Sequence, residues 1–515
     1  MLFSTYTFLV FFLPLVLLGY YGLGRFHWRL ATGWLTLSSL GFYAWWKPDP
    51  NQPWSPLFLL LVIGSCAANY LCGNAIAGST RPAIRRGLVT AGVTANLTLL
   101  AYYKYLGIFA VWTHAATGWP ASIPHPVMPL AVSFFTFLQI AFLVDVFRGD
   151  RTGYNFADYL LFVTFFPHLI AGPLVHHREL IGQFRPRVTR FNPRFLAVGL
   201  TVLGIGLFKK VVLADNLAEV ATPIFQFASQ GIRPLAPGEA WAGALAYTFQ
   251  IYFDFSGYSD MAIGASYMFG LRLPLNFNSP YKSVSIIDFW RRWHMTLSRF
   301  LRDYLYIPLG GNRRGPIRRY SNLMVTMLLG GLWHGAGITF VVWGALHGIY
   351  LCVNNAWIGV RKRFGWRPIP RPAAVAVTFL AVVFAWVPFR AGNFELASSG
   401  NARLAWNTTS RFYQAMVVPG GGPVWTHIAD GHIMKAKRAV RPLVYAILVA
   451  FLFPNTQEVL GRLSPHFRTG REPRRRRHRW WSWRPVPLAA VGVFLLLVVV
   501  TLEMDRGGEF IYFQF

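Results

Sequence analysis

The chain of 515 residues is 54% hydrophobic and only 13% charged. A soluble protein usually has about 25% charged residues, so this composition excludes a set of ordinary soluble domains and indicates a membrane protein. The 49 Lys and Arg against 19 Asp and Glu give a net charge of +30, but the basic residues fall between apolar runs. Anionic lipid headgroups are therefore the expected partners, and no nucleic acid is expected.

Long stretches without Asp, Glu, Lys or Arg follow one another along the chain. About 20 apolar residues cross the hydrocarbon core as one helix. The uncharged runs are 1–24, 30–46, 51–80, 105–144, 320–360, 372–389 and 485–502, with shorter interrupted runs near 87–103, 155–177, 195–222, 240–270 and 442–457. We therefore predict an all-α polytopic membrane protein with roughly eleven membrane segments, in a single domain that covers 1–515.

The basic residues between these runs predict the orientation of the chain. Lys and Arg collect in cytoplasmic loops, and the clusters lie at 25–29, 81–86, 148–151, 185–194, 313–319, 361–371 and 474–479. This pattern places the loops around 45–51 and 112–129, and both chain ends, outside the cell. The Arg-rich and Trp-rich segment 462–484 is expected to be a basic cytoplasmic loop at the bilayer surface.

Two apolar segments, 155–177 and 320–360, have basic flanks on both sides, so each must enter and leave the membrane on the same side. Helix breakers lie in the middle of each, namely Pro167, Gly172 and Pro173 in the first and Gly330, Gly331, Gly335 and Gly337 in the second. Irregular backbone at membrane depth is tolerated where it is buried in protein or lines a cavity. We predict that each is a re-entrant segment or a hairpin.

Ionisable residues inside apolar segments mark either a functional site or a paired structural charge. Asp145 precedes Arg148 by three positions, which predicts an ion pair at a helix end. Lys209, Lys210 and Asp215 interrupt an apolar run, and lysine side chains can extend to the membrane interface.

Asp254 and Asp260 have no basic residue within one helical turn, so they either pair across helices or line a cavity. A transporter or flippase could use Asp254, Asp260 and Lys209 as a coupling relay. The absence of a visible internal repeat in the sequence weakens that alternative.

The segment 285–306 has the spacing of an amphipathic helix at the cytoplasmic interface. Its apolar positions are Ile286, Phe289, Trp290, Trp293, Leu297, Phe300, Leu301 and Tyr304, and Arg291, Arg292, Arg299 and Arg302 lie opposite. His294 falls at the edge of the apolar stripe, beside Trp290 and Ser298, and could point either inward or outward.

His334 is the strongest candidate for chemistry, because four glycines flank it within an uncharged segment. Glycines weaken a helix and allow close backbone approach, and a histidine can act as general base on a hydroxyl. We predict proton transfer by His334, supported by His294. His347 lies about 220° around an unbroken helix from His334, so the two share a site only if the glycines bend the segment.

Other catalytic and metal-binding patterns are missing from the sequence. It contains no nucleophile elbow, carboxylate pair, P-loop or metal-binding motif, and the cysteines lack a metal-ligand spacing. We therefore expect no metal and no bound cofactor.

Motifs along nearly the whole chain resemble the membrane-bound O-acyltransferase family, in its bacterial alginate O-acetyltransferase branch. The matching segments are Met1-Leu2-Phe3-Ser4, Ser133-Phe134-Phe135-Thr136-Phe137, Phe165-Phe166-Pro167, Ile170-Ala171-Gly172-Pro173, Lys209-Lys210-Val211-Val212, Ala214-Asp215, 252–260, 289–294, 302–311, Leu332-Trp333-His334-Gly335, Trp343-Gly344, His347-Gly348, 454–458 and 510–515. The resemblance implies a ring of helices around a central tunnel, with His334 catalytic and His294 the second essential histidine.

The resemblance also implies a reaction and a location. Acetyl-CoA is the expected donor substrate, entering from the cytoplasm, and the acetyl group passes across the bacterial cytoplasmic (inner) membrane. Extracytoplasmic acetyltransferase partner proteins would complete O-acetylation of an exported polysaccharide such as alginate. D-alanyl transfer to teichoic acid and peptidoglycan O-acetylation are the alternatives within the family.

Supporting residues are expected around this site. Asp254, Trp333, Trp290, Ser298 and His347 are expected to shape or support the tunnel. Basic residues near the inner mouth would suit the phosphates of the donor or would anchor the chain at the interface; they are Arg291, Arg292, Arg313 and Arg314.

Overall fold

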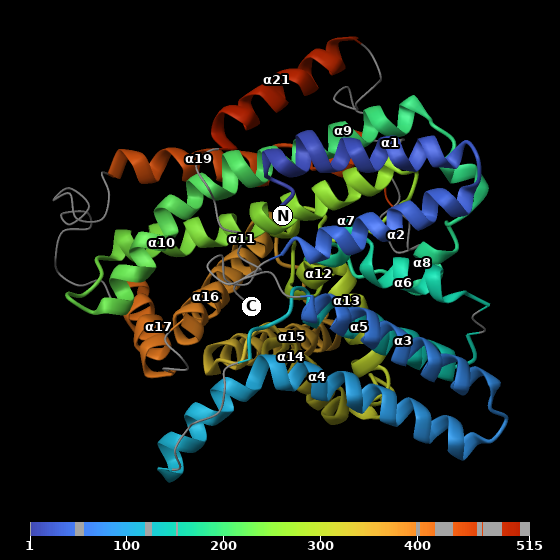
Figure 1. Ribbon diagram of the computed structural model, residues 1–515. Helices are drawn as coiled ribbons and strands as arrows, with labels where there is room; N and C mark the ends of the chain where they lie inside the picture. Colours follow the sequence, from blue (N-terminus) through green and yellow to red (C-terminus); the bar gives the residue numbers. More distant parts are fainter. Residues whose placement is uncertain are drawn as a thin grey trace.

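The computed structural model describes residues 2–46, 56–118, 126–150, 153–397, 402–417, 436–460, 466 and 487–504, and its elements in these ranges are helices (Figure 1). In chain order they are η1 (Thr7–Phe12), α1 (Leu13–Gly24), α2 (Trp28–Ala44), α3 (Leu57–Gly78), α4 (Pro82–Thr117), α5 (Val132–Phe147), α6 (Phe156–Thr164), α7 (Phe166–Leu169), α8 (His177–Ile181), η2 (Pro186–Thr189), α9 (Pro193–Leu207), η3 (Phe208–Ala214), α10 (Asp215–Gln230), α11 (Pro237–Met268), η4 (Pro280–Lys282), α12 (Ile286–Trp290), α13 (Met295–Leu301), η5 (Arg302–Tyr306), α14 (Gly315–His334), α15 (Ile338–Phe364), α16 (Arg371–Ala397), α17 (Ala402–Val417), α19 (Ala436–Phe451), α20 (Thr456–Leu460) and α21 (Pro487–Glu503). The all-α prediction is confirmed for these residues.

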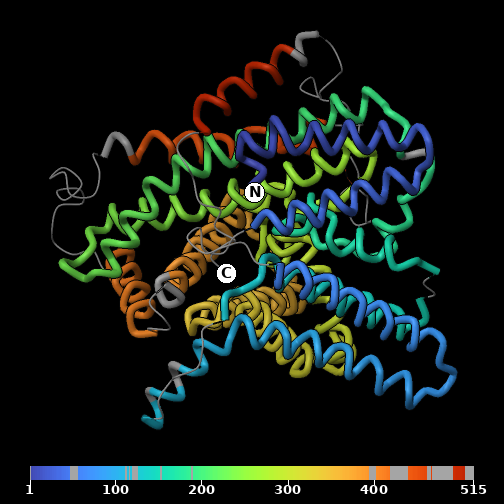
Figure 2. Tube along the Cα trace, viewed as in Figure 1, coloured from blue at the N-terminus to red at the C-terminus, as the bar shows by residue number. Residues whose placement is uncertain are grey.

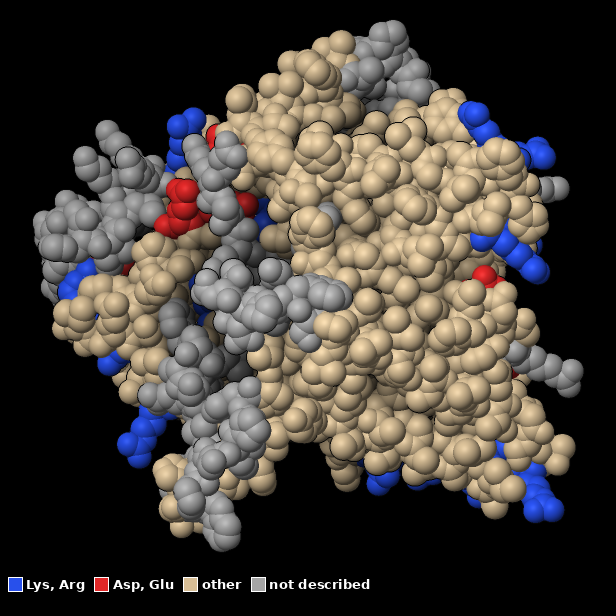
Figure 3. All heavy atoms as spheres, in the orientation of Figure 1, with Lys and Arg blue, Asp and Glu red and all other residues tan. Residues whose placement is uncertain are grey.

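The described helices have the lengths and surface of a multi-pass membrane protein. Five are long and apolar enough to cross a bilayer, namely Thr7–Gly24, Leu57–Gly78, Pro193–Gln230, Ile338–Phe364 and Arg371–Asn393. Most of the charged atoms lie toward the left and right margins of the face in Figure 3, with a broad uncharged area between them. The ring of roughly eleven membrane spans around a central tunnel stays a prediction.

Helix α11 is the centre of the assembly, and α9, α10, α16, α17 and α19 pack against it (Figure 2). Small residues allow this close packing. A Cβ added to Gly206 of α9 would lie 2.6 Å from the Gly257 carbonyl oxygen of α11, and one added to Gly264 would lie 2.7 Å from the Gly199 carbonyl oxygen. Nearly all residues of α11 are consequently buried.

The segment 320–360 forms most of a helical hairpin. Helix α14 ends at His334, residues 335–337 leave the helical conformation, and α15 begins at Ile338. The two helices pack along each other, and a Cβ added to Gly331 would clash with the Phe340 carbonyl oxygen. The glycines therefore allow the backbones to meet as well as to turn.

The segment 155–177 is also broken. Two short helices, α6 and α7, are followed by nonhelical residues before α8 begins at His177. Side chains satisfy freed backbone groups, as buried polar groups require: the Phe166 amide donates to Ser39 Oγ at 3.2 Å and the Leu174 amide to Thr296 Oγ1 at 3.0 Å.

The prediction of one continuous amphipathic helix over 285–306 is wrong. The segment forms α12, α13 and the π-helical η5, with a break in which His294 adopts φ +40°. Backbone bonds to residues 276–278 explain the break, because the Met295 amide donates to the Asn276 carbonyl and the Asn278 amide to the Arg292 carbonyl. The predicted loop 462–484 lies outside the described residues, apart from His466.

Candidate active site

His334 is the last residue of α14 and lines a cavity of about 160 Å³. The side chain is buried, at 5% exposure, whereas Trp46 and Met128 at the edge of the same cavity are partly exposed. The nonhelical residues after His334 place the imidazole at a helix end. An imidazole, a group that can act as a general base, therefore lines a cavity large enough for a small acyl group or several waters.

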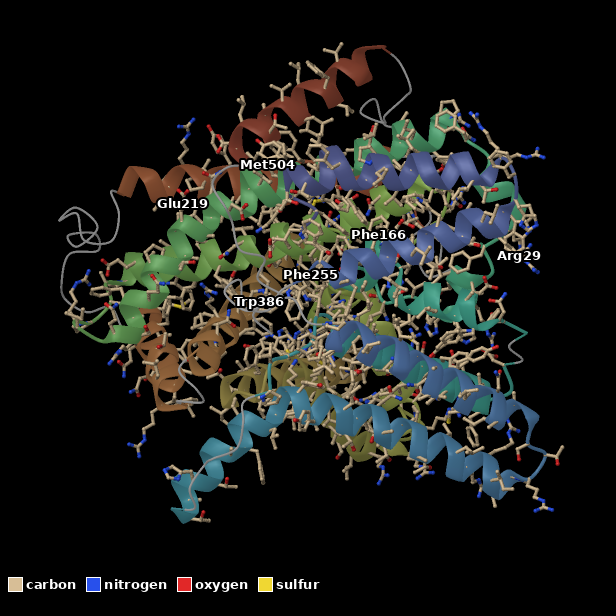
Figure 4. The ribbon with its side chains drawn as sticks, in the orientation of Figure 1. Arg29, Phe166, Glu219, Phe255, Trp386 and Met504 are labelled. Carbon is tan, nitrogen blue, oxygen red and sulfur yellow. The ribbon has the colours of Figure 1, made fainter. Side chains whose placement is uncertain are left out.

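Aromatic rings from three helices surround the His334 imidazole. Its ring centroid lies 4.9 Å from that of Trp333, 5.1 Å from Trp343 of α15 and 5.2 Å from Phe389 of α16. Trp386, one turn before Phe389, continues this cluster and lies near the middle of the helices in Figure 4. The rings restrict the orientation of the imidazole through packing.

Lys104 of α4 is a site residue that the sequence analysis missed. Its ammonium donates to the backbone carbonyls of Trp333 and His334, the latter at 3.0 Å, and it lines the same cavity. The neighbouring Tyr105 hydroxyl donates to the Leu332 carbonyl at 2.7 Å. Because the last carbonyls of a helix lack partners within the helix, α4 fixes the end of α14 that carries His334.

His294 points inward and is fully buried. Its Nδ1 lies 3.0 Å from Asn276 Oδ1. An amide oxygen only accepts, so Nδ1–H donates, and Nε2 is the basic atom of the neutral ring. The same oxygen accepts from the Thr296 hydroxyl at 2.9 Å, which fixes the histidine relative to α13.

A second, small cavity of about 10 Å³ lies on the other side of an aromatic stack. Thr296, His176 and Phe137 are among its lining residues. Phe137 stacks on Phe300 at 4.2 Å and on Trp333 at 5.0 Å between ring centroids. These three rings, which we call the aromatic partition, lie between the His334 cavity and the small cavity.

His347 joins the His334 cluster although it lies on the next helix. Both rings contact Trp343, at 5.1 Å for His334 and 4.8 Å for His347. The turn at 335–337 therefore bends the segment as a shared site requires. Trp290 also contacts the His347 ring, at 5.1 Å.

The carboxylates in α11 form buried ion pairs. Asp254 Oδ1 lies 2.9 Å from Lys210 Nζ, and Asp260 Oδ2 lies 2.6 Å from Lys209 Nζ. Lys210 also pairs with Asp215 at 2.7 Å. Both lysines therefore form ion pairs inside the protein, and of the two hypotheses for the aspartates the structure shows pairing across helices.

The remaining predicted residues lie away from the two cavities. The Ser298 hydroxyl donates to the Trp293 carbonyl at 3.3 Å, and Arg292 pairs with Asp288 at 2.9 Å. Three further arginines are exposed, namely Arg291, Arg313 and Arg314. None of these five residues is among those that line either cavity in the described part of the chain.

Comparison with known proteins gives consistent matches. The model of the membrane-bound O-acyltransferase family matches residues 98–389. The peptidoglycan O-acetyltransferase of Helicobacter pylori is 43% identical over 77% of this chain and 78% of that protein. The probable alginate O-acetylase of Pseudomonas aeruginosa is 44% identical over 77% and 73%, and that of Pseudomonas fluorescens is 37% identical over 100% of both chains.

Proposed function

The chain belongs to the membrane-bound O-acyltransferase family and is an O-acyltransferase, and from this premise we propose that it moves acetyl groups from cytoplasmic acetyl-CoA to an exported polysaccharide. It works in the bacterial cytoplasmic membrane, among lipids and with extracytoplasmic acetyltransferase partner proteins. The observation that carries the proposal is His334, buried at a helix end beside a cavity and held there by Lys104.

His334 acts as the general base in this proposal. The imidazole takes the proton of an acceptor hydroxyl, whose oxygen attacks the thioester carbonyl carbon. The carbon–sulfur bond breaks, and the thiolate of CoA receives the proton from the imidazolium. The Lys104 ammonium, which lines the same cavity, stabilises the negative charge that develops on the carbonyl oxygen.

Two separate cavities support an entry route on each side of the membrane. The donor approaches from the side of Thr296 and His176, which line the small cavity, and the acceptor reaches His334 from the side of Trp46. Because the small cavity has a volume of only about 10 Å³, donor binding requires the side chains of the aromatic partition to move. His294 assists by holding the donor carbonyl or by sharing the proton.

The exposed arginines at the predicted cytoplasmic side have two possible roles. Arg291, Arg313 and Arg314 suit the phosphates of CoA, because guanidinium groups bind phosphate in a bidentate manner. They serve equally well as anchors to anionic headgroups. Replacing them in pairs would raise the KM for acetyl-CoA only in the first case.

The similarity to relatives favours an acetylated polysaccharide as the final product. The full-length match is to a probable alginate O-acetylase, whereas the peptidoglycan O-acetyltransferase match covers 77% of this chain. An alginate-type exopolysaccharide is therefore our proposed acceptor. Peptidoglycan is the second candidate, since identity over the matched part is as high.

The decisive experiment measures acetyl ester on surface polymers of cells that carry this gene as the sole copy. His334→Gln should abolish the ester while the protein remains in the membrane at normal amount. His27→Asn is the matched control: His27 caps α2 through the Arg29 amide, and Asn is a good cap, so ester should be unchanged. Normal ester in the His334→Gln strain would refute the catalytic role.

The same strains identify the acceptor and exclude transport. Acetyl ester is quantified separately on exopolysaccharide and on peptidoglycan, and D-alanyl ester is measured beside them. With labelled acetyl-CoA inside membrane vesicles, an acyltransferase moves only the acetyl label outward. Polymer export that fails in the variant, with acetylation per sugar unaltered, would favour a transporter instead.

A further inference from the structure

A second cluster of polar side chains lies near the C-terminal end of α5. The N-terminal end of the same helix, at Val132, lines the His334 cavity. The cluster consists of Asp145 at the end of α5, Asp150 in the following loop and His177 at the start of α8, on the right in Figure 1. One ligand atom from each residue lies within 4.8 Å of the others. All three side chains are largely buried.

The His177 ring is the feature that hydrogen bonding within the protein does not explain. The side chain is 2% exposed, and neither ring nitrogen makes a hydrogen bond to any residue that the structure describes. Buried polar atoms are normally paired. Here Nε2 points between two carboxylates, 3.5 Å from Asp145 Oδ2 and 3.7 Å from Asp150 Oδ2.

These separations suit ligands of one metal ion better than hydrogen bonds. An N–H···O bond has a heavy-atom distance of about 2.9 Å. Two ligands that each stand about 2.1 Å from a tetrahedral zinc ion lie roughly 3.4 Å apart. A closure of a few tenths of an ångström would bring Nε2 to this spacing from each carboxylate. The two carboxylates, which lie within 4.8 Å of each other, would also move closer together to share the ion.

We propose that Asp145, Asp150 and His177 bind a divalent transition-metal ion, with zinc as the best-suited ion. One imidazole and two carboxylates form a donor set that zinc accepts, and water completes four ligands. This site is independent of the proposed acyl transfer, because it lies at the other end of α5 from His334.

Neighbouring side chains provide the support that metal ligands require. The Tyr304 hydroxyl donates to Asp145 Oδ2 at 2.8 Å and lies 3.1 Å from His176 Nδ1. His176 Nδ1 is itself 3.5 Å from Asp145 Oδ2. Tyr304 therefore fixes the first carboxylate from η5, and His176 stands close enough to become a fourth ligand.

Two arginines near the cluster compete with the metal only weakly. Arg178 pairs with Asp150, but its side chain is 62% exposed and can turn into solvent. Arg148 lies 4.0 Å from Asp145 and is 43% exposed. A cation at the centre of the cluster neutralises two carboxylates that these exposed guanidinium groups do not enclose.

The metal would strengthen contacts that other bonds already make between these elements, since Arg299 of α13 pairs with Glu179 of α8 and Arg148 donates to the Asp303 carbonyl of η5. It joins the end of α5 to α8, and through Tyr304 to η5. His176, next to His177, lines the small cavity beside the aromatic partition. The ion would thus hold α5, α8 and η5 together next to the small cavity, without a part in the acyl transfer itself.

The test uses the full-length protein in detergent, stripped with a chelator and then dialysed against zinc ions. We expect about one zinc per chain by mass spectrometry in the wild type. Both His177→Ala and Asp150→Asn should bind zinc at least tenfold more weakly. Asp158→Asn, a carboxylate of α6 outside the cluster, is the matched control and should bind as the wild type does.

Thermal unfolding and cobalt spectra provide measurements that do not depend on one variant folding well. Zinc should raise the melting temperature of the wild type and of Asp158→Asn but not of Asp150→Asn. Cobalt should give the wild type the visible absorption of a tetrahedral site. Equal zinc in all variants, or a wild type without bound zinc or cobalt absorption, would overturn the proposal.

Discussion

Two regions of this membrane protein place ionisable side chains among apolar helices, and they do so in opposite ways. In the η3–α11 region, Lys209, Lys210, Asp254 and Asp260 form buried pairs at 2.6–2.9 Å. In the α14–α15 hairpin, His334 lies among aromatic rings and lines a cavity. The sequence marks both regions as unusual, but the geometry separates them. The charges of the closed pairs compensate each other, whereas a titratable group beside a cavity can meet a substrate.

The largest effect is expected at His334, where a substitution should lower the activity without impairing folding. His334→Gln in purified protein should lower acetyl transfer by about 10²- to 10⁴-fold, the usual contribution of a general base. The melting temperature should stay close to the wild-type value, because glutamine keeps a polar side chain of similar length. A rate within a few fold of the wild type would mean that His334 has a structural role and is not the general base.

The ion-pair region should show the reverse pattern. Lys209→Met leaves the buried Asp260 carboxylate without its cation, a change that costs about 3–5 kcal/mol, so the yield of folded protein and its melting temperature should fall. The double variant Lys209→Met with Asp260→Leu should recover most of that stability. The fraction of the protein that folds should transfer acetyl at the normal rate per molecule. A lower rate per folded molecule would support the alternative in which Lys209 and Asp260 form a coupling relay.

Lys104 lies between these extremes, because it is a cation that lines the cavity and also binds backbone. Lys104→Met should lower kcat by about 10- to 100-fold, since the end of α14 and its imidazole would shift, while the KM for acetyl-CoA changes little. Lys282→Met is the matched control, because Lys282 also donates to a backbone carbonyl, that of Phe453. Equal losses in both variants would mean that Lys104 acts only on stability.

The smallest effect is expected at Asn276. Asn276→Ala removes the acceptor that orients His294, a loss of about 1 kcal/mol and roughly fivefold in rate. Asn276→Asp keeps the acceptor oxygen and should restore most of the activity. Ser298→Ala should behave as the wild type, because that hydroxyl only donates to the Trp293 carbonyl.

The sequence predicts the class of fold well, because apolar length and helix breakers act locally. Gly335 and Gly337 correctly mark the turn after His334, and Pro167 correctly marks a broken segment. The break at His294 could not be predicted from periodicity. It depends on backbone bonds to residues 276–278, which are distant in sequence.

The sequence draws attention to the histidines of the candidate site but not to their partners. His334 has a local signal in its glycines, whereas Lys104 lies in a helix about 230 positions earlier and shows its role only through contacts with carbonyls. Asp145 illustrates the same limit. Its predicted partner Arg148 lies 4.0 Å away, but Tyr304 is closer at 2.8 Å, and nothing in the spacing of Asp145, Asp150 and His177 matches a known motif.

The aromatic partition of Phe300, Phe137 and Trp333 bears on proton leakage across the membrane. An acyltransferase that worked as we propose, with reagents arriving from both faces, would have to prevent protons from leaking across the membrane. Protons cross membranes along files of water, and the space of about 10 Å³ beneath these rings holds at most about one molecule. In the proposed reaction this stack would interrupt a file of water between the two cavities and so limit proton leakage between turnovers.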